Sequence, residues 1–280
     1  GLNDAPRRWW NIIDTSLRKY GLVPTRADRC TYVLYSDKRS SRVSAPPKPN
    51  KFTDITSTVD AAIDYLTDPI SGSQAKGRAT AGLVCLHVDD LFMCGDKEFV
   101  ERVYKPLIAD YKVGSEDINN VEFVGQRIKW NEASPESGNR PYLSVDQNKN
   151  IDSMSEINLE NHKDDKMLCD PKTHTMYRSV LGQINWLQSR AQFHACYFFS
   201  RAASASQNPT IADCRALNKL VRTIRSTPVI LRFYALKGDL RFIGYPDASY
   251  QNNADKSSQR GLCICLAEPR TSTTSSPKGT

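Results

Sequence analysis

Two adjacent aspartates between two short apolar runs are the feature that most constrains how this chain folds. The stretch LVCLHVDDLFMCGD covers residues 83–96 and places Asp89 and Asp90 at its centre. The flanking runs consist mainly of residues that favour strands, whereas Asp favours turns because its side chain bonds the nearby backbone. Two such runs separated by two turn-forming residues predict a β-hairpin whose turn is Asp89-Asp90.

The two carboxylates have two explanations at this point. A plain hairpin turn is the commoner one for a pair of aspartates taken alone. The other is a metal site, because Mg²⁺ is commonly held by one or two carboxylates together with substrate phosphates. A two-metal site would need a third carboxylate from a neighbouring strand. Six upstream aspartates lie in loop-like or helix-like stretches: Asp28, Asp37, Asp54, Asp60, Asp64 and Asp68. We therefore expect an incomplete metal site within this chain.

The composition and charge of the chain permit a nucleic-acid partner without requiring one. The 280 residues suit one or two domains, and an apolar content of 39% is enough for a packed core. A net charge of +7 is compatible with a polyanionic partner or with an ordinary solvated surface. Lys219, Arg222 and Arg225 recur at helical spacing, so they form either one basic face or a plain solvated face.

The cysteines and the first residues of the chain indicate an intracellular protein. The eight cysteines contain no C-x-x-C pair. Cys263 and Cys265 would share one face of a strand, which favours buried thiols over zinc ligands. The first ten residues lack the apolar segment of a signal peptide, and no apolar run is long enough to cross a membrane. We therefore expect reduced thiols, no membrane partner, and a cytoplasmic or nuclear location rather than secretion.

Apolar periodicity predicts a chain that mixes helices with antiparallel strands, which is an α+β fold. Helical spacing predicts helices at Asp4–Tyr20, Val59–Leu66 and Lys97–Tyr111, and a helical block over Met176–Ala235. Strand-like runs lie at Thr31–Tyr35, Val121–Trp130, Tyr142–Val145, Leu240–Tyr245 and Arg260–Leu266. Polar, turn-rich composition predicts a Pro/Ser-rich insertion at 36–58 and a disordered tail at 269–280.

The order of several motifs resembles that of a known family. The sequence HVDD at 87–90, between its two apolar runs, is similar to the Y-V-D-D hairpin of reverse transcriptases, and most closely to that of copia-type LTR retrotransposons. GLNDAPRRWW at 1–10 resembles the family's G-L-K-Q-A-P-R-x-W motif, which contacts the incoming nucleotide and the template. Further resembling motifs follow in the family's order along nearly the whole chain: DRCTYVLY at 28–35, FVGQRIKW at 123–130, YLSVDQ at 142–147, the long stretch at 177–201 and GYPDASYQNNADKSSQRG at 244–261.

This resemblance implies a division of the chain into parts. Residues 1–150 would form a partial reverse transcriptase palm, in which an antiparallel sheet packs with helices around the insertion at 36–58. Residues 151–236 would form the helical thumb and connection. Residues 237–268 would be the truncated start of a ribonuclease H-like α/β domain, followed by the tail.

The resemblance also implies an activity and a set of site residues. The family is an RNA-directed DNA polymerase that adds deoxynucleotides to a primer 3′-OH on an RNA or DNA template, with Mg²⁺ or Mn²⁺ in a two-metal mechanism. Asp89 and Asp90 would be catalytic metal ligands, and Asp247 would be a catalytic metal ligand of the ribonuclease H site. The nucleotide and template contacts would fall on Gly1, Leu2, Asn3, Ala5, Pro6 and Arg7. The primer grip would fall on Phe123, Val124 and Gly125.

The chain departs from the family pattern in ways that leave its function open. His87 stands where the family has Tyr, and Asp4 stands where it has Gln, so an acid would lie near nucleotide phosphates unless a cation neutralises it. The family's third polymerase aspartate precedes the motif at Gly1, and its later ribonuclease H acids would follow Thr280. Two functions stay open: a reverse transcriptase fragment, and a catalytically inactive nucleic-acid-binding remnant of a retrotransposon Pol polyprotein. A third outcome is a poorly soluble chain with an exposed sheet edge.

Overall fold

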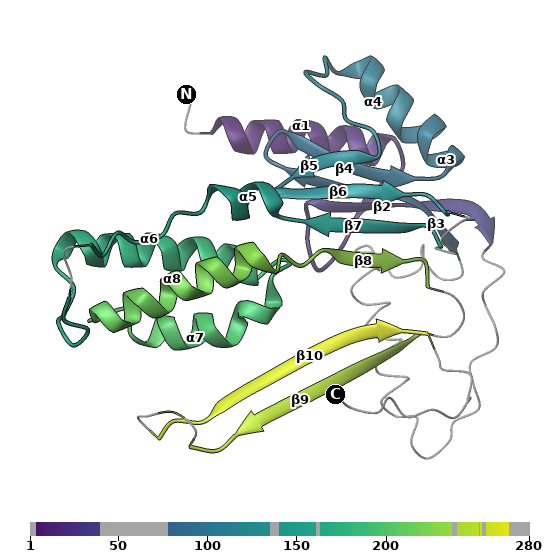
Figure 1. The fold of residues 1–280 in the computed structure, drawn as a ribbon. Helices are drawn as coiled ribbons and strands as arrows, with labels where there is room; N and C mark the ends of the chain where they lie inside the picture. The colour runs from purple at the N-terminus through teal and green to yellow at the C-terminus, as the bar shows by residue number, and fades with distance from the viewer. Residues whose placement is uncertain are drawn as a thin grey trace, which may run out of the picture. The chain divides into compact units, whose positions relative to one another are not determined.

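The structure is a computed structural model, and it confirms an α+β chain with antiparallel sheets and helices (Figure 1). The chain divides into two compact units, Gly1–Ile118 and Asn119–Thr280. Several predictions lie outside the described residues: Gly1–Asn3, the helix at Val59–Leu66, most of the insertion at 36–58, and the tail at 269–280. The described residues are 4–39, 78–134, 140–160, 163–236, 240–251, 253 and 256–268.

The first unit begins with helix α1 (Ala5–Lys19), as predicted. Pro6 suits its first turn because the N–H that proline lacks would have no helical partner there. Gly21 follows the end of the helix with a φ of 92°, a conformation that favours glycine. Ile13 and Leu17 are buried in the core of the unit, whereas Ile12, which shares the helical spacing in the sequence, is 54% exposed.

Four antiparallel strands in the order β1-β2-β3-β4 form the sheet of the first unit. They are β1 (Val23–Pro24), β2 (Thr31–Arg39), β3 (Arg78–His87) and β4 (Asp90–Gly95). Strand β2 continues four residues beyond the predicted Tyr35, so the prediction that residues 36–39, with Asp37, lie in a loop was wrong. The outer edge of β4 is unpaired among the described residues, because β4 ends the strand order. The core of the unit includes Ile13, Leu17, Tyr32, Leu34, Val84, Phe99, Val103 and Leu107.

A helical run follows β4, as predicted, but it is not uniformly α-helical. The π-helical turn at Val100–Tyr104 separates α3 (Lys97–Phe99) from α4 (Lys105–Asp110). Pro106 lacks the N–H that would bond the carbonyl four residues earlier, which accounts for a wider turn just before it.

The second unit begins with a four-stranded antiparallel sheet in the order β5-β6-β7-β8. Its strands are β5 (Asn120–Phe123), β6 (Gln126–Asn131), β7 (Tyr142–Asp146) and β8 (Leu231–Tyr234). The strand predicted at 142–145 is confirmed as β7, which pairs with β6.

Two predictions about this sheet were wrong. The segment Val121–Trp130 is a hairpin rather than a single strand, because Val124 and Gly125 adopt φ values of 49° and 64° and reverse the chain. Residues 231–234, placed in the helical block, form β8 and pair with β7. Pairing with a strand more than 80 residues away in the sequence leaves no local signal.

The helices of the second unit pack around one core (Figure 1). They are α5 (Asn148–Ser153), α6 (Pro171–Gln188), η2 (Phe193–Ala195), α7 (Cys196–Ser204) and α8 (Ile211–Ser226). Thr210 and Asp213 form a reciprocal capping box at the start of α8, and Asp170 caps α6 by accepting a hydrogen bond from the backbone of Thr173. The core includes Ile151, Met154, Ile157, Tyr177, Val180, Ile184, Leu217, Val221 and Ile224.

The last described elements are β9 (Arg241–Ser249) and β10 (Gln259–Ala267), which pair as an antiparallel hairpin. Cys263 and Cys265 share one face of β10, with their Sγ atoms 3.7 Å apart. The prediction that they are buried was wrong, since both are exposed, and the reason is that β9 and β10 form a sheet of only two strands. In the described part of the chain, no helix combines the length and apolar character needed to cross a membrane.

Candidate functional site

The hairpin that carries the two aspartates forms, but its turn lies one residue earlier than predicted. His87 pairs with Asp90, which leaves Val88 and Asp89 as the two turn residues. Asp90 is therefore the first residue of β4. Burial of Leu86 explains this register, because a slip of one residue would turn its side chain to the opposite face of the sheet.

The turn adopts a strained conformation that helix α1 supports. Val88 has a φ of 55°, which is unusual for a β-branched residue, and its side chain is 64% exposed. The indole N–H of Trp9 donates a hydrogen bond of 2.7 Å to the carbonyl oxygen of Val88. The ring of Trp9 packs edge-on against Tyr111, whose hydroxyl lies 2.6 Å from that of Ser16. Trp9 on α1 is thus held by Tyr111 at the end of α4, and its indole holds the turn at Val88.

Phe99 holds the other end of the hairpin. Gly82 and Gly95 are register partners at the base of β3 and β4. A Cβ atom at either glycine would lie 2.3 Å from the ring of Phe99, so only glycine leaves room for this ring. Asp96 caps the following helix by accepting a hydrogen bond from the backbone N–H of Phe99. Gly95 therefore leaves space for the ring of Phe99, and Asp96 fixes the start of the helix that carries this ring.

Asp89 and Asp90 are both exposed at the tip of the hairpin, and neither has an ion-pair partner among the described residues. Neighbouring carboxylates repel each other, and a divalent cation relieves that repulsion. The pair fits the usual protein share of a Mg²⁺ site, in which substrate phosphates supply further oxygens. A two-metal site needs more ligands, and within the described ranges no cluster of three or more His, Cys, Asp or Glu side chains is present.

The predicted nucleotide and template residues lie at the start of α1 as far as they are described. Ala5, Pro6 and Arg7 form its exposed first turn. The carboxylate of Asp4 lies 2.6 Å from the guanidinium of Arg8. Both side chains are exposed, so this ion pair is weak.

The predicted primer-grip residues form the turn between β5 and β6. Phe123, Val124 and Gly125 are half-buried. The carbonyl oxygen of Gly125 accepts a hydrogen bond of 3.1 Å from the side-chain amide of Asn150 on α5. A Cβ at Gly125 would approach that amide to 3.2 Å and the indole of Trp186 to 3.5 Å. Helices α5 and α6 therefore hold this turn within the second unit.

Asp247 lies inside β9, opposite Gly261 on β10, and is exposed. The sequence placed it after the strand, but β9 continues through Ser249. Asp247 belongs to the second unit, whereas the aspartate pair belongs to the first.

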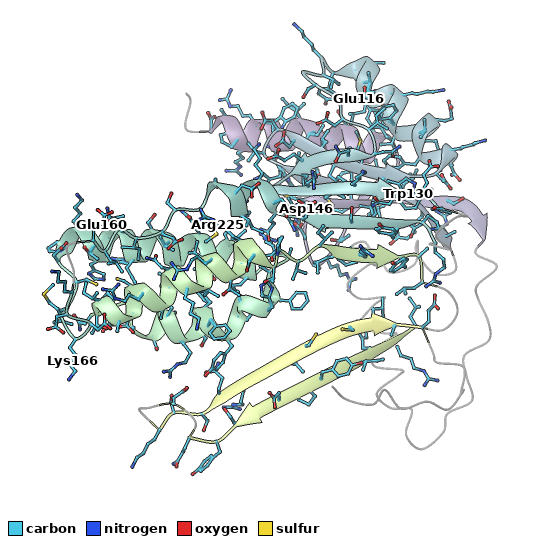
Figure 2. The ribbon with its side chains drawn as sticks, in the orientation of Figure 1. Glu116, Trp130, Asp146, Glu160, Lys166 and Arg225 are labelled. Carbon is cyan, nitrogen blue, oxygen red and sulfur yellow. The ribbon has the colours of Figure 1, made fainter. Side chains whose placement is uncertain are left out.

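Most of the predicted basic face of α8 makes contacts inside its own unit. The guanidinium of Arg222 forms an ion pair with Glu156. The guanidinium of Arg225, labelled in Figure 2, donates to the carbonyl oxygen of Met154. Two of the three cations at helical spacing therefore tie the segment 154–156 to the helix, a role that the sequence reading missed because their partners are distant in the sequence.

Sequence reasoning also missed Trp9 as a residue of the candidate site. It lies in the first motif, three residues before Ile12 and four before Ile13, a spacing that by itself indicates only the apolar face of a helix. Its indole N–H instead reaches a backbone oxygen 79 residues further along the chain. No local pattern identifies such a partner.

No protein-family model, no curated protein and no solved structure matches this chain.

Proposed function

We propose that this chain is part of a copia-type retrotransposon reverse transcriptase. One observation carries the proposal: the hydrogen bond from Trp9 to Val88 joins the motif at the start of the chain to the hairpin tip with its two exposed aspartates. In a polymerase, these two motifs have to meet at one site. A turn held by a packed indole presents its carboxylates in a defined position.

The proposed parts follow the order of the motifs. The antiparallel strands and helices of 1–150 correspond to a partial palm, and 151–236 to a thumb and connection in which α6, α7 and α8 share one core. The hairpin of β9 and β10 corresponds to the first strands of a ribonuclease H-like domain, with Asp247 as one of its acids. These assignments rest on the order of the motifs. The proposed palm spans the boundary between the two compact units, and β8 of the proposed connection completes the sheet of β5, β6 and β7.

The residues have distinct roles in this proposal. Asp89 and Asp90 would hold Mg²⁺ or Mn²⁺, which when bound lowers the pKa of a primer 3′-OH and neutralises phosphate charge. Arg7, together with Gly1, Leu2, Asn3, Ala5 and Pro6, would contact the nucleotide and the template. Phe123, Val124 and Gly125 would hold the primer strand. The substrates would be an RNA or DNA template-primer and deoxynucleotides.

A primer-extension assay on an RNA template tests the proposal. Extension by the wild-type chain would support the polymerase assignment, and it should then fall at least about 100-fold in Asp89→Asn and in Asp90→Asn, because a lost metal ligand removes charge stabilisation from the reaction. Asp117→Asn, which changes an exposed acid of the same unit, is the matched control and should retain the wild-type rate.

Two other outcomes would change the assignment. Salt-sensitive binding of the template-primer without extension would support the alternative, a catalytically inactive nucleic-acid-binding remnant. Neither binding nor extension, in a chain that melts cooperatively, would overturn both functions.

A further inference from the structure

One face of the sheet in the second unit combines tyrosines with cations. Side chains alternate between the two faces of a strand, so the register places one set of residues together. Asn131 pairs with Tyr142, and its side-chain amide donates a hydrogen bond of 2.9 Å to the hydroxyl of Ser144, which confirms the shared face. The residues of this face on β6, β7 and β8 are Arg127, Lys129, Asn131, Tyr142, Ser144, Asp146, Arg232 and Tyr234.

Three of these side chains and that of Arg140, which lies just before β7, form a row that we call the tyrosine–arginine ladder. Its four members are Arg140, Tyr142, Arg232 and Tyr234. Tyr142 and Tyr234 are cross-strand partners whose ring centroids lie 5.3 Å apart. The guanidinium carbon of Arg232 lies 5.4 Å from the ring centroid of Tyr142, and that of Arg140 lies 5.5 Å from the ring centroid of Tyr234. Each arginine is therefore held over an aromatic ring while remaining exposed.

The acids of this face are already neutralised. Asp146, labelled in Figure 2, is buried and forms an ion pair of 2.8 Å with Arg127. Glu122 on β5 forms an ion pair of 2.9 Å with Lys149. The acids that lie on the strands of this face thus bring no net negative charge to it.

The remaining cations leave the face positive. Arg232 and Lys129 have no ion-pair partner among the described residues. Arg140 has one loose partner, because its guanidinium lies 3.8 Å from the carboxylate of Glu268 and both side chains are partly exposed. Exposed pairs of this kind are weak, so an incoming phosphate competes readily with Glu268.

We propose that the tyrosine–arginine ladder, together with Lys129, binds the phosphate backbone of a nucleic-acid strand. A guanidinium that lies over a tyrosine ring keeps its N–H donors at its edge, and a phosphate is bound through those donors. The ring restricts the arginine before binding, so less side-chain entropy is lost when the phosphate arrives. Backbone contacts of this kind position a strand without reading its sequence. The choice of nucleic acid over another polyanion rests on the proposed function.

Binding of a fluorescein-labelled oligonucleotide, followed by anisotropy, tests this proposal. We expect the Arg140→Ala/Arg232→Ala double variant to bind single-stranded DNA or RNA at least about 10-fold more weakly at moderate salt. The slope of log K against log salt should fall in magnitude by about 1.4, since each lost phosphate contact on a single strand contributes about 0.7.

The matched control is Lys163→Ala/Lys166→Ala, which removes the same charge from exposed positions. Lys166 lies at the far end of the helices from this sheet (Figure 2). If both double variants bind the oligonucleotide equally weakly, the proposal is overturned. Binding would then depend on the net charge of the protein and not on the ladder. Undetectable binding by the wild-type chain would overturn it as well.

Two further variants separate charge from ring stacking and guard against misfolding. Arg140→Lys/Arg232→Lys keeps the charge but loses the planar group, and Tyr142→Leu/Tyr234→Leu keeps the arginines but loses the rings. Each should weaken binding by about 3-fold while the thermal melt stays cooperative. If the lysine and leucine variants both bind like the wild type, the stacking of arginines over tyrosines has no role in binding, and the proposal is overturned.

This outcome is independent of the extension assay. If the ladder variants bind the oligonucleotide like the wild type while the wild-type chain extends a primer, only the present inference is wrong. If the ladder variants bind more weakly but the wild-type chain does not extend a primer, the polymerase assignment is wrong and the binding surface stands.

Discussion

Val88 shows how one residue can be unfavourable for the backbone and still be tolerated. A β-branched residue in the left-handed region costs on the order of 1–3 kcal/mol relative to an allowed conformation. Val88 occupies this region at a φ of 55°, beside an aspartate that we assign to the site. The hydrogen bond from Trp9 contributes about 1 kcal/mol in the opposite direction. The turn is thus held in place by tertiary contacts rather than by its own sequence.

Replacing this valine by glycine should stabilise the first unit. We expect Val88→Gly to raise the free energy of unfolding by about 1 kcal/mol, because the relief of strain exceeds the entropy cost of glycine. Urea unfolding followed by circular dichroism measures the change. Val113→Gly is the matched control: Val113 is also exposed but has no positive φ, so glycine there should destabilise slightly or have no effect. A lower unfolding free energy for Val88→Gly would show that the turn is not strained.

At the scale of elements, two buried side-chain amides bind the backbone of segments that lie outside helices and strands. They make the pair of hydrogen bonds that a neighbouring strand would otherwise make. Asn218 on α8 accepts a hydrogen bond from the backbone N–H of Ile157 and donates one to its carbonyl oxygen, both at 2.8 Å. Gln192 makes the same pair of bonds to Val229, both at 2.9 Å. Backbone groups that lie outside helices and strands need such partners when they are buried. These amides therefore attach the connecting segments to the helical core.

Removal of one amide should destabilise the second unit strongly. We expect Asn218→Ala to lower its free energy of unfolding by about 3 kcal/mol, because two buried backbone groups lose their partners. Asn185→Ala on α6 removes an exposed amide and should change the unfolding free energy by less than about 0.5 kcal/mol. Thermal melts of both variants measure the difference. Similar melting temperatures for the two variants would mean that water replaces the lost bonds to Ile157.

At the scale of the whole molecule, each of the two units has its own core and its own fully buried tyrosine. Tyr32 in the first unit donates a hydrogen bond of 2.7 Å to Asp14, and Tyr177 in the second donates one of 2.8 Å to the carbonyl oxygen of Ala202. Burial raises the pKa of the Tyr32 hydroxyl, with the bond to Asp14 and its charge as further causes. Burial, followed by the charge of Asp213, raises the pKa of Tyr177.

Both units should therefore lose stability at alkaline pH. A folded-state pKa above the unfolded value of about 10 means that stability is fully present below pH 10 and is lost as the pH rises beyond it. Far-ultraviolet circular dichroism between neutral and strongly alkaline pH measures this loss. Tyr32→Phe should move the alkaline transition of the first unit to higher pH, while Tyr250→Phe, at an 84% exposed position, should not. An unchanged transition in Tyr32→Phe would mean that another group controls it.

Local patterns were sufficient for the elements whose signal lies in neighbouring residues. The helix over 5–19, the helical run over 97–110 and the hairpin around the aspartate pair all follow from apolar spacing and turn-forming residues. The α+β class follows from the mixture of the two periods. Of the candidate site, the sequence also identified the acids themselves, because adjacent carboxylates between strand-forming runs are conspicuous.

Tertiary structure decided the features that depend on distant partners. The turn moved to Val88-Asp89 because burial of Leu86 sets the register. Residues 231–234 became a strand because β7 was available to pair with them. Arg222 became an internal ion-pair partner because the loop with Glu156 folds back onto α8.

The sequence alone therefore determined which residues carry charge, which stretches favour helix or strand, and where the two carboxylates stand. Only the tertiary structure decided that an indole from α1 holds the turn beside them, and that two arginines lie over two tyrosines on one face of a sheet. The physical reason is that hydrogen bonds, ring stacking and strand register depend on distances in space. Residues 79 or more positions apart carry no mark in the sequence that they will meet.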